Sequence, residues 1–364
     1  MKTIKKIITF ILLIIVLMIS TLFMQFSFAK EVTFSEYGNV LSDSIDNLDA
    51  KIVDIAMLGA HDAFSNRINK KSEPNPNEDG IVHNKFVNAI GKGLVVRMSR
   101  AQTSMPENML NAGVRYFDVR ITKVEDDYYT CHGYLSDKLD LYIKDIVNFL
   151  ETHTGEYVII DIQHFYAEGN DNDNFNALFD YIRNIKGNNG TNLFDYVHYD
   201  SSIDQLRDLK YGKVVSNKSS AGVVIFAKTH NFNEIYYRDG DARYGISNYE
   251  NVYSLWHEQN KSSTMLECIE NEYNYLSEND FSNLLIINQA QKTGFIMDKR
   301  IIRSLFSWSI IDMAKNFNEV LVSDKDRFIK WLDKMPVFMV DNVTSSKSFV
   351  EKANEYINSF NQSL

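Results

Sequence analysis

Short apolar segments alternate with helical segments along most of this chain, and this alternation constrains the fold more than any other feature. The segment "EYVIIDIQHF" (156–165) is almost continuously apolar, as strands buried on both faces are. The segment before it, 137–153, repeats its apolar residues at helical spacing. Strands that are separated by helices favour a mostly parallel sheet.

The remaining segments continue the pattern and are numerous enough for one barrel domain. A first strand is predicted to end before residue 61, further strands at 115–121, 128–133, 222–228, 283–290 and 337–343, and helices at 173–185, 265–276, 298–317, 324–333 and 348–360. The chain has 364 residues, a length that suits one large α/β domain. We expect a single irregular (β/α) TIM-type barrel over 30–364, in preference to an open sheet. In such barrels, catalytic residues lie at the C-terminal ends of the strands.

The first 29 residues are predicted to lie outside this domain. Three lysines precede an apolar stretch from Ile7 to Met24, and small residues stand at Ser27 and Ala29. This is the pattern of a secretory signal peptide, with cleavage expected after Ala29 and the mature protein secreted. The apolar stretch is also long enough to cross a bilayer, so a retained membrane anchor is the alternative.

Charge and cysteine content exclude several classes of function. The net charge is −10, and nucleic-acid binding requires clustered positive charge, so we expect no nucleic-acid partner. The two cysteines, Cys131 and Cys268, permit one disulfide in a secreted chain. No metal-binding spacing motif is present, and we expect neither a metal nor another cofactor.

Polar side chains gather at the ends of the predicted strands. They are His61, Asp62, Asp118, Arg120, His132, Gln163, His164, Lys228 and Asp341. Two imidazoles can serve as base and acid in one reaction cycle, and an arginine can bind a phosphate through two hydrogen bonds. These are the groups that phosphoryl transfer needs. A structural role is the alternative for each residue, including an Asp118–Arg120 ion pair and a merely packed His164.

Two local patterns carry structural predictions only. Ser104 and Glu107 have the spacing of a capping box, with Pro106 in the first turn of the helix that would follow. The stretch from Asn66 to Gly93 contains "KKSEPNPNEDG" and is predicted to be a long surface loop.

Four ordered motifs resemble a known family. They are "MLGAHDAFS" (57–65), "SRAQTSMPENMLNAGVRYFDVRI" (99–121), "CHGYL" (131–135) and "EYVIIDIQHFY" (156–166). In order and spacing they are similar to the X-domain of phosphatidylinositol-specific phospholipases C (PI-PLC), particularly the simple bacterial enzymes and the X-domain-only proteins. The resemblance is strong over 52–166 and returns at "VFMVDNV" (337–343).

The resemblance implies a mechanism in which the inositol 2-hydroxyl displaces diacylglycerol and leaves a cyclic phosphate. His61 resembles the general base, Asp341 the carboxylate that orients it, and His132 the general acid, assisted by Asp62. Arg120 resembles the phosphate-binding arginine of the metal-independent members. The resemblance also implies that Asp118 holds Arg120 or its neighbours in place. Gln163 and Lys228 take positions that contact inositol, although Gln163 replaces a charged residue of the family.

Three functions therefore remain open. The first is a secreted, monomeric lyase that acts on phosphatidylinositol or glycosyl-phosphatidylinositol (GPI) anchors at a membrane surface. The second is a phosphodiesterase for another lipid or glycerophosphodiester head group. The third is a catalytically silent barrel that binds lipid or glycan.

Overall fold

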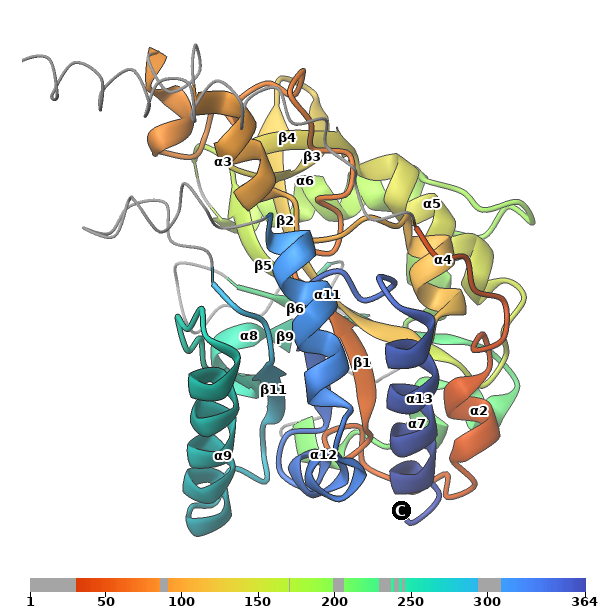
Figure 1. Cartoon of the computed structure of the whole chain (residues 1–364). Coiled ribbons are helices and arrows are strands. Elements are labelled where there is room, and N and C mark those ends of the chain that lie inside the picture. The colour runs from red at the N-terminus through yellow and green to blue at the C-terminus, as the bar shows by residue number, and fades with distance from the viewer. Residues whose placement is uncertain are drawn as a thin grey trace, which may run out of the picture. The chain divides into compact units, whose positions relative to one another are not determined.

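The computed structural model describes residues 31–85, 91–169, 171–198, 206–228, 237–238, 242–243, 246–293 and 309–364 (Figure 1). The predicted signal segment 1–29 and residues 298–308 of one predicted helix lie outside this set. Among the described helices, none is both long enough and apolar enough to cross a bilayer. Glu31–Leu364 form a single unit.

A parallel sheet forms the centre of this unit. Its eight strands lie in the spatial order β10 (Val252–Ser254), β11 (Leu285–Gln289), β12 (Val337–Val340), β1 (Met57–Ala60), β2 (Val114–Val124), β5 (Tyr157–Tyr166), β6 (Gly222–Ala227) and β9 (Ile246–Ser247). All neighbouring pairs are parallel. This arrangement confirms the predicted barrel-type α/β fold. Among the described residues, no ladder joins β9 to β10.

The helices follow or connect these strands. They are α2 (Val40–Ser44), α3 (Lys92–Ser99), α4 (Pro106–Asn111), α5 (Leu139–Leu150), α6 (Asp171–Asn184), α7 (Tyr211–Val214), α8 (Asn248–Asn251), α9 (Ser262–Glu278), α11 (Ile310–Leu321), α12 (Lys325–Leu332) and α13 (Lys347–Asn361). Short 3₁₀ turns are η1 (Ile81–His83), η3 (Leu193–Tyr196), η4 (Leu206–Asp208) and η5 (Ser216–Lys218). β7 (Tyr237–Arg238) and β8 (Ala242–Arg243) form a separate two-stranded sheet. In Figure 1, α11 and α13 stand side by side in front of β1.

Alternation along each strand divides the core into two layers. Ile159 and Met339 belong to a cluster inside the curled sheet, whereas their neighbours Ile160 and Val340 belong to the cluster between sheet and helices. A strand side chain points to the face opposite that of its neighbour, so a strand buried on both sides reads as continuously apolar. Burying one such side chain contributes about 2 kcal/mol.

β1 is held closely between its neighbours and ends just before the candidate site. A Cβ added at Gly59 would lie 3.1 Å from side-chain atoms of both Met339 and Tyr116, so glycine allows this close approach. The strand ends at Ala60, and Asp62 then adopts a left-handed φ of 43°. Aspartate tolerates this conformation better than most residues and turns the chain out of the sheet.

β2 extends beyond the sheet edge, and the chain then returns in a hairpin. β3 (Asp127–His132) pairs antiparallel with β2, and β4 (Tyr134–Lys138) pairs antiparallel with β3. The segment predicted as a strand at 128–133 is therefore a hairpin strand rather than a member of the parallel series. The register pairs Ile121 with Thr130, so the returning strand carries His132 back along β2, past the level of Arg120.

Two local predictions need correction. The N-cap of α4 is Met105, without a side-chain cap, and Ser104 Oγ instead lies 2.5 Å from Thr344 Oγ1. The predicted surface loop is in part packed against the hairpin, because Asn75 is fully buried and its N–H donates to the carbonyl of Gly133. Both differences arise from partners that are distant in sequence.

Candidate active site

His61 is oriented by a carboxylate from near the other end of the chain. His61 follows β1 and Asp341 follows β12, so the two residues leave adjacent parallel strands side by side. His61 Nδ1 lies 2.7 Å from Asp341 Oδ1. A carboxylate at Nδ1 favours the tautomer with the proton on that nitrogen, which leaves Nε2 able to accept one. The His61 side chain is 16% exposed, so its ring can be reached from solvent.

Asp62 lies between a guanidinium and a second imidazole. Its Oδ1 is 2.5 Å from Arg120 Nε, and its Oδ2 is 3.0 Å from His132 Nδ1. The Asp62 side chain is almost completely buried, whereas those of Arg120 and His132 are 21% and 23% exposed. The aspartate therefore forms the floor of the cluster, and the guanidinium and the imidazole form its accessible part.

His132 is held at one ring nitrogen only. Its Nδ1 lies 3.0 Å from Asp62 Oδ2 and 3.0 Å from the carbonyl oxygen of Ser99, at the end of α3. Within the described part of the chain, Nε2 has no hydrogen-bond partner. A protonated His132 can therefore donate from Nε2 to an incoming group.

The carboxylates determine the protonation of the site. Burial alone lowers the pKa of His61, but the negative charges of Asp62, Asp341 and Asp118 outweigh it and raise the pKa to about 9. Burial alone would raise the pKa of the Asp62 carboxyl, but Arg120 and His132 hold that pKa well below its usual range. The same ion pair raises the pKa of Arg120, which stays cationic. Burial raises the pKa values of Asp118 and Asp341.

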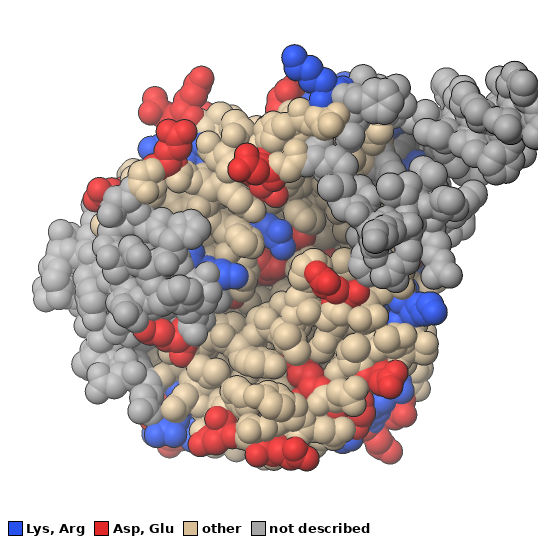
Figure 2. All heavy atoms as spheres, turned by 90° about the vertical axis from the view of Figure 1, so that its left-hand side faces the viewer, with Lys and Arg blue, Asp and Glu red and all other residues tan. Residues whose placement is uncertain are grey.

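Opposite charges thus lie in direct contact across a partly exposed site. Figure 2 shows one face of the molecule on which basic and acidic side chains lie together in a central depression. Such an arrangement can bind an anion at the guanidinium, remove a proton at one imidazole and supply a proton at the other.

Three of these side chains come close enough to act as ligands for a cation. Ligand atoms of His61, Asp62 and Asp118 lie within 4.8 Å of one another. Asp62 is already paired with Arg120, whose fixed positive charge would repel a cation at this position. Three ligand atoms are also fewer than the six to eight oxygens that calcium takes. The donor set does not fit a calcium site.

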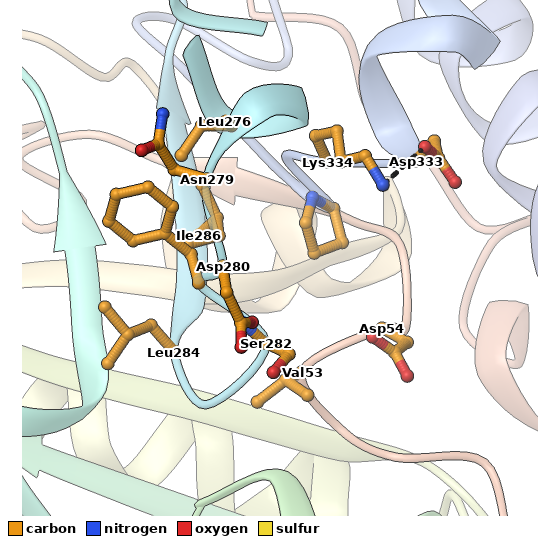
Figure 3. A pocket seen from close by; sticks show the side chains of 12 residues that line it. Val53, Asp54, Leu276, Asn279, Asp280, Ser282, Leu284, Ile286, Asp333 and Lys334 are labelled. Carbon is orange, nitrogen blue, oxygen red and sulfur yellow. Dashed lines mark hydrogen bonds and ion pairs between the residues drawn. The ribbon is translucent and has the colours of Figure 1, made fainter.

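A separate pocket lies at the opposite end of the strands. It has a volume of about 190 Å³, and its lining includes Val53, Asp54, Leu284, Lys334 and Pro336, which precede or begin β1, β11 and β12 (Figure 3). The only ion pair drawn there joins Lys334 to Asp333, at 3.1 Å. Because the candidate catalytic groups lie at the C-terminal strand ends, this pocket is not part of their site.

The sequence is similar to those of several known proteins. PI-PLC X domain-containing protein 3 from Mus musculus is 34% identical over 166 residues, which cover 44% of this chain and 50% of the relative. Variant-surface-glycoprotein phospholipase C from Trypanosoma cruzi is 30% identical over 125 residues, covering 32% of this chain and 33% of the relative. No protein-family model matches the chain.

Solved structures of bacterial PI-PLC enzymes have a similar fold. PI-PLC from Listeria monocytogenes has a TM-score of 0.58 at 14% identity and covers 89% of this chain and 99% of its own. A variant of the Staphylococcus aureus enzyme has a TM-score of 0.57 at 13% identity, covering 89% and 99%. The predicted resemblance to the PI-PLC X-domain is confirmed. The aligned part spans about half the length of the mouse relative, and the structural likeness establishes the fold alone.

Of the two roles that the X-domain resemblance implied for Asp118, holding Arg120 or holding its neighbours, the structure has the second. Arg120 forms its ion pair with Asp62. Asp118 Oδ2 instead accepts the N–H of Asp62 at 3.3 Å and lies 3.8 Å from His61 Nε2. Asp118 therefore supports the turn after β1 and adds negative charge beside the candidate base.

The two residues expected to contact the inositol lie on or just after neighbouring strands of the parallel sheet. Gln163 is on β5, where its Nε2 donates to Asp161 Oδ2 at 2.7 Å. The buried Asp161 also accepts a short hydrogen bond from Tyr116. Lys228 follows β6, and its N–H donates to the carbonyl of Ile162 at 2.9 Å. Both residues lie at the same edge of the sheet as His61 and Arg120, and their contact with a head group stays a prediction.

His164 lies closer to the site than the sequence indicated. It pairs in register with Arg120 across β2 and β5, immediately after a register shift, and its ring stacks on Tyr166. Burial and the positive charges of Arg120 and Lys228 lower the pKa of His164 to about 4, so its imidazole is neutral near pH 7. In the sequence, the feature that indicated this location was the position of His164 near the end of an apolar strand.

The cysteines do not pair. Cys131 and Cys268 are both free. Burial raises the pKa of the Cys131 thiol well above its usual value, and Asn75 Nδ2 lies 3.4 Å from its sulfur. Cys131 is therefore an inert, packed thiol beside His132.

Proposed function

We propose that this protein is a phosphodiesterase-lyase that cleaves phosphatidylinositol into diacylglycerol and inositol cyclic phosphate. The observation that carries the proposal is the pair of imidazoles, each held at Nδ1 by its own carboxylate, with a guanidinium paired to the carboxylate of His132. The names of the sequence relatives and of the solved neighbours support the same substrate class.

The reaction assigns one proton transfer to each histidine. His61 Nε2 takes the proton of the inositol 2-hydroxyl, whose oxygen attacks phosphorus, and Asp341 stabilises the imidazolium that forms. The bond from phosphorus to the diacylglycerol oxygen breaks, and His132 Nε2 gives that oxygen its proton. The product is a five-membered cyclic phosphate, and each histidine ends the step in the protonation state that the reverse transfer needs.

Arg120 binds the phosphate. Its guanidinium offsets the negative charge that builds on the non-bridging oxygens as phosphorus becomes five-coordinate. Asp62 contacts both the guanidinium of Arg120 and the imidazole of His132. The group that binds the phosphate and the group that protonates the leaving oxygen therefore keep a fixed spacing. No metal ion has a role in this scheme.

The cellular setting belongs to the same proposal. The signal-like segment 1–29 supports secretion, with a membrane-anchored form as the alternative if the segment is retained. In this proposal the protein acts as a monomer on phospholipid at a membrane surface. GPI anchors contain the same inositol phosphodiester and are proposed as a second substrate.

The deciding experiment uses purified protein and vesicles that contain phosphatidylinositol labelled in the inositol ring. We expect release of labelled inositol cyclic phosphate, together with diacylglycerol, and loss of both products in His61→Ala. Release of a linear inositol phosphate as the first product would refute the intramolecular attack. Turnover of a different phosphodiester alone would assign another head group, and turnover of none would indicate a silent binding barrel.

A further inference from the structure

One buried amide joins the two strands that carry the candidate base and its carboxylate. Gln102 is completely buried and lies in the segment between α3 and α4. Its Nε2 donates to the carbonyl oxygens of His61 at 2.9 Å and Val340 at 3.0 Å. Its Oε1 accepts the N–H of Val343 at 3.1 Å. Both N–H groups of the amide are therefore hydrogen-bonded, one to the end of each strand.

These bonds lie where the β1–β12 ladder stops. The last pair in register is Ala60 with Val340, and the last bond between the two strands runs from the His61 N–H to the Val340 carbonyl at 3.1 Å. Beyond this bond β1 turns out of the sheet at Asp62, so the ladder does not continue past His61 and Asp341. Gln102 supplies hydrogen bonds there in place of a strand.

We propose that Gln102 is a positioning residue that sets the distance between His61 and Asp341. It acts through the backbone of both strands and touches no reacting atom. The 2.7 Å contact between His61 Nδ1 and Asp341 Oδ1 requires the two strand ends to keep a fixed spacing, because charge-assisted hydrogen bonds weaken steeply with distance and misalignment.

The segment that carries Gln102 is itself held by hydrogen bonds, so the backbone from which the amide extends has a fixed position. Ser65 Oγ accepts the backbone N–H groups of Ala101 at 2.9 Å and Gln102 at 3.3 Å. The Asn342 N–H donates to the carbonyl of Ala101 at 2.7 Å, which ties the segment to β12 as well. A side chain held this way transmits little motion to the strands that it bridges.

The chain offers a matched control at the other end of β1. Asn361 is also buried, and it exchanges two hydrogen bonds of 2.9 Å with the backbone of Ala56, just before the strand begins. Both amides hold backbone next to β1, but only Gln102 does so beside His61. A purely structural contribution would appear equally at both positions.

The test compares Gln102→Leu and Gln102→Asn with Asn361→Ala. The leucine keeps the approximate volume and removes every hydrogen bond, and the asparagine keeps the amide on a chain too short to reach both strands. The first measurement is the pKa of His61 by NMR titration of the imidazole in the absence of substrate. The second is kcat and KM on phosphatidylinositol vesicles.

In the Gln102 variants we expect the pKa of His61 to fall by about one unit, because Asp341 stabilises the imidazolium less well. We expect kcat to fall by about tenfold or more, with KM within about twofold, as for a mispositioned catalytic group. Asn361→Ala should unfold at a lower temperature and leave the His61 pKa and kcat unchanged.

An unchanged His61 pKa in a folded Gln102 variant would overturn the proposal. So would failure of both Gln102 variants to fold while Asn361→Ala folds, since Gln102 would then serve stability alone. The kinetic measurement rests on the proposed function, but the titration does not. Absence of turnover in the unaltered protein would therefore refute that function and leave the positioning role to be decided by NMR.

Discussion

Asp341 Oδ1 lies 2.7 Å from His61 Nδ1, although 280 positions separate the two residues in the chain. An ionised carboxylate can only accept, so the imidazole donates from Nδ1 and presents Nε2 to the substrate. The contact exists because β1 and β12 are adjacent and parallel, and both end one residue before the contacting side chain. The fold itself thus defines the tautomer of the proposed base.

Replacing this carboxylate tests that assignment. Asp341→Asn should lower kcat by about 10²-fold or more, because an amide nitrogen can donate to Nδ1 and so favour the wrong tautomer. Folding should be nearly normal, as judged by the melting temperature, since the two side chains have almost the same shape. A variant that retained most of its activity would make Asp341 a structural residue.

The two histidines should respond differently to the leaving group. His61→Ala and His132→Ala should each reduce turnover of phosphatidylinositol by about 10²-fold or more. On a nitrophenyl phosphodiester of inositol, whose leaving group needs no proton, His132→Ala should recover much of its rate and His61→Ala should not. Equal losses on both substrates would contradict the division into base and acid.

The raised pKa of His61 predicts the direction of the pH dependence. A general base must be neutral, and the His61 pKa is about 9, so kcat/KM on the nitrophenyl substrate, whose cleavage needs no proton from His132, should increase with pH up to about 9. Asp118→Asn removes one of the three negative charges that raise this pKa and keeps an acceptor for the Asp62 N–H. The ascending limb should therefore move to lower pH. Rate profiles from about pH 6 to about 10 measure it, and an unmoved limb would exclude Asp118 as a cause.

Much of this architecture could be predicted because it depends on local periodicity. Short apolar runs indicated the strands that carry the chain to His61 and Asp341, although the last strand ends at Val340 and not at the predicted residue 343. Parallel strands bring their C-terminal ends to one edge of the sheet. His132 does lie at this edge, as predicted, but the strand that carries it is not one of the parallel series. It arrives on an antiparallel hairpin, which the sequence alone could not distinguish from another parallel strand.

The parts that could not be predicted depend on irregular backbone. Between Val119 and Arg120 the register with β5 shifts by one residue, so Gln163 is the extra residue and His164 lies opposite Arg120. A bulge of this kind reverses which side chains share a face, and strict alternation cannot reveal it. The pairing of Arg120 with Asp62 likewise depends on the left-handed turn at Asp62.

The last prediction concerns Arg120 and is that activity survives an excess of a metal chelator. Phosphodiester cleavage places negative charge on the non-bridging oxygens, and a fixed cation or a metal ion must stabilise it. Arg120 Nε is 2.5 Å from Asp62 Oδ1, so the most buried carboxylate of the His61, Asp62 and Asp118 group is already neutralised.

Arg120→Ala should therefore lower kcat/KM by about 10²-fold or more, a loss of about 3 kcal/mol of transition-state stabilisation. Arg120→Lys should recover only part of this, because an ammonium keeps the charge without the planar pair of donors. The measurement is kcat/KM with and without chelator for all three proteins. Inactivation by chelator that added calcium reverses would mean that the acidic groups hold an ion during catalysis, and Arg120 would then act only by holding Asp62 in place.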